Sequence, residues 1–135
     1  MSTSQNRHRL SFVAVLAFII VISSAASAHH SFSAFNMNEE KTVTGTVKQV
    51  EWTNPHIWIW IDVPDGKGST DTYGFEGMSP NFLERRNWTR TTLKVGDKVT
   101  VSYRPLQNGK NGGMWITGRM ETGKILTGGG GREGQ

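Results

Sequence analysis

Two adjacent histidines, His29 and His30, follow a run of small residues, and they are half of the four histidines in the chain. If the chain were cut just before His29, its free α-amine and its imidazole could chelate one metal ion together. The His30 imidazole and the intervening amide nitrogen would offer a competing chelate of the tetragonal nitrogen type that Cu(II) and Ni(II) favour. The pair predicts a copper site at a new N-terminus. The alternative is that both side chains are solvated at a flexible chain end.

A third histidine, His56, follows Asn54 and Pro55 in a segment between two expected strands. Residues 29–41, fully extended, span up to about 43 Å, so a site that joins His29, His30 and His56 is within the reach of the chain. The alternative is that Asn54 and Pro55 form a tight turn in which His56 only makes a hydrogen bond. Copper is therefore the expected metal, and no cofactor is required.

Two tryptophans, Trp58 and Trp60, alternate with isoleucines in residues 57–63. Side chains alternate across a strand, so the isoleucines face one side and the tryptophans face the other. If it were exposed, the side of the strand that carries Trp58 and Trp60 would bind a sugar, a base or a partner protein, with Asn54 in the adjoining loop. If covered by the helix or the N-terminal segment, the tryptophans would only pack. The second functional hypothesis is therefore a module for a non-metal ligand or an exported partner protein.

Catalytic chemistry finds little support in the sequence. The acidic residues Glu51, Asp62, Glu76 and Asp97 show no spacing that requires them to pair. No nucleophile elbow, metallohydrolase helix or cofactor fingerprint is present. We therefore do not expect an enzyme.

Residues 1–28 have the order of a secretory signal peptide. A short basic region around Arg7 and Arg9 precedes an apolar run and then Ala26-Ser27-Ala28. Cleavage after Ala28 makes His29 the first residue, whereas cleavage after Ala26 would leave two residues in front of the histidines. A membrane span needs about 20 apolar residues, so a stable anchor after cleavage is not expected. The predicted location is outside the cytoplasm, in the periplasm of a Gram-negative cell.

The charge of the chain argues against nucleic acid as a partner. The full chain carries 15 basic and 11 acidic side chains, a net charge of +4. Loss of Arg7 and Arg9 with the signal leaves 13 basic side chains and a net charge of +2. That is too little for the electrostatic footprint of nucleic-acid binding. The chain has no cysteine, so neither disulfides nor a thiolate metal site can form.

The remaining pattern predicts an all-β fold with one short helix. Strands are expected at residues 43–52, 57–63, 70–76, 98–103 and 114–120, with a bulge near Lys48 and Gln49. Ser79 and Pro80 are typical of a helix start. This order is that of a five-stranded, OB-like Greek-key barrel. We expect an N-terminal extension at 29–41, a small β-barrel domain at 42–127 and a disordered Gly-rich tail at 128–135.

Three blocks of the sequence resemble a family of small exported bacterial proteins of unknown function. They are HHSF, GTVKQVEWTNPHIWIWIDV and GMSPNFLERRNWTRTTLKVGDKVTV, in this order, and the resemblance covers about residues 29–120. It implies an exported bacterial protein with a single barrel. It implies no activity and no catalytic residues.

Overall fold

The computed structural model describes residues 32–129 of the chain. It divides the chain into two units, Met1–Ala34 and Phe35–Gln135, and every strand among the described residues belongs to the second unit. The expected signal peptide, His29 and His30 therefore lie outside the described residues.

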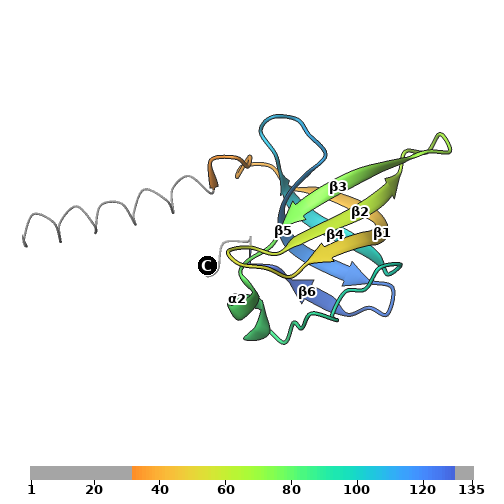
Figure 1. Cartoon of the computed structure of the whole chain (residues 1–135). Coiled ribbons are helices and arrows are strands. Elements are labelled where there is room, and N and C mark those ends of the chain that lie inside the picture. The colour runs from red at the N-terminus through yellow and green to blue at the C-terminus, as the bar shows by residue number, and fades with distance from the viewer. Residues whose placement is uncertain (1–31, 130–135) are drawn as a thin grey trace, which may run out of the picture. The chain divides into compact units, whose positions relative to one another are not determined.

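The second unit is a closed β-barrel with one short helix (Figure 1). Its sheet order is β3-β2-β1-β4-β5-β6, and a parallel pairing of β3 with β5 closes the ring. This confirms the all-β, five-stranded, OB-like prediction. The elements in chain order are β1 (Lys41–Glu51), β2 (Trp58–Pro64), β3 (Thr70–Glu76), α2 (Pro80–Glu84), β4 (Lys98–Pro105), β5 (Gly112–Met120) and β6 (Ile125–Thr127).

Strand β2 has the two-sided character that its alternating sequence predicts. Ile59 and Ile61 point into the barrel and have no exposed surface, whereas Trp58 and Trp60 are only partly buried. The register between β1 and β2 shifts between Val47 and Gln49, which is where a bulge was expected. The bulge changes the phase of β1, so that both of its halves keep apolar residues on the inner side.

The helix begins where the sequence predicts. Ser79 caps it, because its hydroxyl accepts a hydrogen bond from the Phe82 amide at 3.4 Å, and Pro80 occupies the first turn. Leu83 is fully buried in the core of the barrel. The helix therefore contributes apolar surface to the core between β3 and β4.

The seam between β3 and β5 depends on close backbone approach. Gly112 has a φ of 127°, and a Cβ atom there would overlap the backbone oxygen of Gly74. A Cβ atom at Gly113 would overlap the backbone oxygen of Arg104. Two adjacent glycines thus allow β5 to lie between β3 and β4 and to close the ring.

Strand β6 pairs with β5 outside the five-stranded ring and was not expected from the sequence. The Trp115 indole N–H donates to the Leu126 carbonyl at 3.4 Å, and the Gly128 amide donates to the Ile116 carbonyl at 2.8 Å. Ordered contacts thus continue through the first residue of the expected tail. Residues 130–135 of that tail lie outside the described part of the chain.

Candidate functional site

His56 lies in the loop between β1 and β2 and is partly buried. Its Nδ1 atom contacts the Glu76 carboxylate at the end of β3, and 32% of the His56 side chain is exposed. Asn54, two residues before His56, is exposed, and the peptide bond between Asn54 and Pro55 is cis. The partner of His56 is thus a carboxylate on another strand and not a group within its own turn.

Trp58 and Trp60 form a stack on the outer face of β2. Their ring centroids are 5.9 Å apart, and the ring planes differ by 23°. Neither side chain belongs to the hydrophobic core cluster of buried residues or to the side chains packed against it. The two indoles are therefore partly exposed on the barrel surface, on the opposite side of β2 from the isoleucines.

The missing side chain of Gly74 makes room for this stack. Gly74 lies opposite Trp60 in the register between β2 and β3. A Cβ atom at Gly74 would lie 3.2 Å from Trp60 Nε1 and 3.9 Å from Trp58 Cζ3. The Trp60 indole therefore lies closely over Gly74, where a side chain would force it to shift, whereas the contact with Trp58 would be an ordinary van der Waals contact.

Polar side chains surround the stack on the neighbouring strands. Trp58 lies in register with Glu51 on β1 and with Glu76 on β3, so a carboxylate flanks it on each side. Gln49 lies opposite Trp60, and its amide donates to a Glu51 carboxylate oxygen at 2.9 Å.

Asp62 extends this outer face beyond Trp60. Thr72 Oγ1 donates to Asp62 Oδ1 at 2.7 Å, and Lys48 Nζ lies 3.3 Å from the same oxygen. The Thr72 hydrogen bond lowers the pKa of Asp62 below its ordinary value, and the Lys48 contact adds to this effect against a loss of hydration that raises it. At this end of the face, the charge of the Asp62 carboxylate is therefore offset by the charge of Lys48.

We call the surface formed by Trp58, Trp60, Glu51, Glu76 and Asp62 the tryptophan face. Its aromatic members were predicted from the sequence. Glu76 was missed as part of a site, although its outward phase on residues 70–76 is a signal that could have placed it beside Trp58. Gly74 gave no such signal, because its role depends on how closely the Trp60 indole lies over β3, which the sequence does not show.

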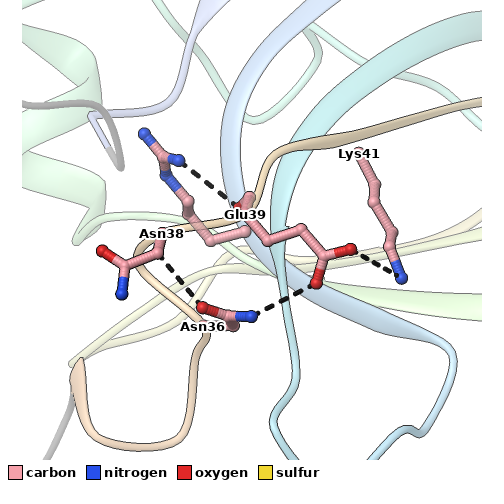
Figure 2. Close-up of polar contacts among 5 residues, drawn as sticks. Asn36, Asn38, Glu39 and Lys41 are labelled. Carbon is pink, nitrogen blue, oxygen red and sulfur yellow. Dashed lines mark hydrogen bonds and ion pairs between the residues drawn. The ribbon is translucent and has the colours of Figure 1, made fainter.

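The N-terminal residues of the second unit are bound to β4 and to the segment that follows it. The backbone N–H of Asn36 donates to the Pro105 carbonyl at 2.8 Å. Figure 2 shows the polar contacts of this segment, in which the Glu39 carboxylate accepts from the side-chain amide of Asn36 at 3.2 Å and pairs with Lys41 at 3.3 Å. These contacts hold residues 36–41 against β4, where Arg104 also donates to the Glu39 carbonyl at 3.4 Å.

A shallow, open hollow of about 250 Å³ lies over β1, β4 and β5. The hydroxyls of Thr44 and Thr100 in its wall bond to each other at 2.8 Å, and Lys98 pairs with Glu121 at 3.6 Å. Most of its polar groups are thus already paired within the described chain. It also has no aromatic surface, so the tryptophan face is the better candidate for binding.

Within residues 32–129, no group of three or more histidine, aspartate or glutamate side chains is placed to hold a metal ion. Of the three predicted metal ligands, only His56 lies within the described residues. Its carboxylate contact there is with Glu76. No helix in the same range is long and apolar enough to cross a membrane.

Comparison with known proteins gives one match. The model of a family of unknown function, DUF6152, matches residues 16–116. No curated protein matches the chain. No solved structure matches it either.

Proposed function

Since this chain belongs to DUF6152, a family of unknown function, we propose its role from its own residues. The protein is an exported binding module, periplasmic in a Gram-negative cell. It holds a ligand or a partner protein on the tryptophan face. No catalytic activity is part of the proposal.

The observation that carries the proposal is the partly exposed stack of Trp58 and Trp60. Large aromatic side chains stabilise a fold most when they are buried, and three other tryptophans of this chain are: Trp52, Trp88 and Trp115. The stacked pair instead lies outside the core, beside carboxylates and an amide that can form hydrogen bonds. A flat apolar surface bordered by polar groups is typical of a site that binds by stacking.

The supporting observation for export is the order of residues 1–28. A basic start, an apolar run and a small-x-small end are the three parts of a secretory signal. Intact mass spectrometry of the protein recovered outside the cytoplasm tests this. We expect a chain that starts at His29, and full-length chain in the membrane fraction would contradict export.

The five indole N–H signals in NMR spectra test the binding face directly. We propose titration with four probes of different chemistry: a neutral disaccharide, a basic peptide, an acidic peptide and a nucleotide. At least one probe should shift the signals of Trp58 and Trp60. Buried Trp88 and Trp115 serve as internal controls, because a ligand on the outer face does not touch them. Equal shifts in all five signals, or no shift with any probe, would contradict the proposal.

A second candidate function is copper binding by His29 and His30, with His56 as a further ligand. The observation that favours His56 is its contact with Glu76 through Nδ1. Histidines that bind metals commonly donate their second ring N–H to a carboxylate, which leaves Nε2 as the ligand atom. A His56→Ala variant tests this part, because unchanged copper affinity would limit the site to the chain terminus.

A further inference from the structure

The charges on the tryptophan face are not balanced. Lys48 lies 3.3 Å from Asp62, and His56 contacts Glu76. Glu51 is paired only with the neutral amide of Gln49 among its described contacts, and it is exposed. A further cation, Arg90, donates to the Trp52 carbonyl at 3.4 Å, and no described contact pairs it with Glu51. The carboxylates of Glu51 and Glu76 therefore leave an acidic region beside Trp58.

Trp58 lies at the centre of this acidic region. Residues that pair directly across neighbouring strands have Cβ atoms about 4.5–5.5 Å apart, so Glu51 and Glu76 each lie next to Trp58. The stack runs along β2, because Trp58 and Trp60 are two residues apart. Each indole therefore turns one face toward its partner and the other face away from it.

A cation over the side of the Trp58 ring that is turned away from Trp60 would use both the aromatic ring and the neighbouring carboxylates. The negative face of an indole attracts ammonium and guanidinium groups, and tryptophan is the best of the aromatic residues for this contact. A carboxylate on each side adds charge attraction at short range. Neutral ligands such as sugars would use the stacking surface but would gain nothing from the excess charge of Glu51.

The occupant of such a site is more consistent with a polypeptide than with a small cation. Small molecules bind in clefts that bury most of their surface, whereas the tryptophan face is the open outer side of a sheet. A chain that crosses the face gains contacts on both sides of the residue it inserts.

From the proposed function, on which this step rests, we infer that the tryptophan face binds a lysine or arginine side chain of a partner polypeptide. The basic group lies over Trp58 between Glu51 and Glu76. Specificity comes from the charge of that group, and the neighbouring indole of Trp60 supplies additional apolar contact.

Two matched peptides test this inference on the mature chain. One is acetyl-Gly-Arg-Gly-Arg-Gly-amide, and the other has citrulline, which is neutral and of nearly the same size, at both arginine positions. The readout is the dissociation constant from the indole N–H shifts of Trp58 and Trp60. We expect the arginine peptide to bind roughly fivefold tighter or more, and its advantage to shrink at high salt.

A pair of glutamate variants separates this site from general electrostatics. Glu51→Gln removes the unbalanced charge and should weaken the arginine peptide roughly two- to fivefold. Glu121→Gln removes an exposed carboxylate that pairs with Lys98 on the other strands of the barrel, and it should change nothing. Both side chains are exposed, so neither change should affect folding.

The outcomes distinguish this inference from the proposed function. Equal affinity of the two peptides, or equal losses in Glu51→Gln and Glu121→Gln, would overturn the choice of a basic partner. If a disaccharide shifts the indole signals of Trp58 and Trp60 while neither peptide does, the proposed binding face is supported and the inference of a basic partner is wrong. If no probe shifts them, both proposals are wrong.

Discussion

Replacing Ile59 with alanine should remove a large share of the stability of the barrel. Ile59 lies on the inner side of β2 and has no exposed surface. The change removes three buried carbons at about 0.8 kcal/mol each, hence about 2.4 kcal/mol of transfer free energy. The cavity that remains adds to this, and such changes typically cost about 2–5 kcal/mol in total. Small domains have only about 5–15 kcal/mol to lose.

The same change at Ile125 is the matched control. Ile125 lies on β6 and is 50% exposed, so about half of its surface is hydrated in the folded state. Its replacement leaves no closed cavity and should cost about 1 kcal/mol or less. Urea unfolding, followed by tryptophan fluorescence, gives both free energies if the slope m is unchanged. The melting temperature should fall by about 10 °C or more for Ile59→Ala.

Equal losses for the two variants, or a greater loss for Ile125→Ala, would refute the reasoning. The inner and outer sides of β2 would then be reversed. The placement of Trp58 and Trp60 on the surface would fail with them, since alternate residues of one strand face opposite sides.

Three further predictions follow from other parts of the molecule. Gly118→Ala should lower the urea midpoint, because a Cβ atom there overlaps the Trp115 ring and overpacking costs about 1–3 kcal/mol; an unchanged midpoint would show that the ring can move freely. Thr72→Val should raise the pKa of Asp62 toward its ordinary value, as measured by NMR of the carboxyl carbon, because it removes the main hydrogen bond that lowers this pKa. Because the pKa of Asp62 is lower in the folded state, its carboxylate stabilises the fold at pH values above its pKa in the unfolded chain. This stabilisation is lost as the pH falls through the pKa of the folded state. The variant lacks most of it, so its acid unfolding should begin at a higher pH. Copper should bind more tightly to a chain that starts at His29 than to one with an extra alanine before it, and binding should weaken below about pH 6, where imidazoles are protonated; equal affinities and identical copper spectra would contradict a terminal chelate.

The sequence predicts the features of this barrel that depend on neighbouring residues. Alternation in residues 57–63 identifies a strand with two unlike faces, and Ser79 with Pro80 marks a helix start. The phase change in β1 predicts the bulge between Val47 and Gln49. Each of these signals arises within about ten residues, so one sequence is enough to recognise it.

Features that depend on distant contacts were not predicted in the same way. Strand β6 has three residues, too few for a period to be recognised, and its order comes from pairing with β5. The contact of His56 with Glu76 joins a loop to a strand 20 residues away. Whether Trp58 and Trp60 were covered or exposed depended on what packs over β2, which alternation alone does not determine.

The glycine seam has a consequence for the order in which the chain can become a barrel. The ring closes only when Gly112 and Gly113 reach β3 and β4, and these residues lie near the end of the described chain. A chain that stops before residue 112 can form only an open sheet, with β3 and β4 as its two free edges. Such edges present unpaired amides and carbonyls that readily pair with other chains. Incomplete copies of this protein should therefore be prone to aggregation through β3 and β4, while the complete barrel hides both strands by joining them through β5.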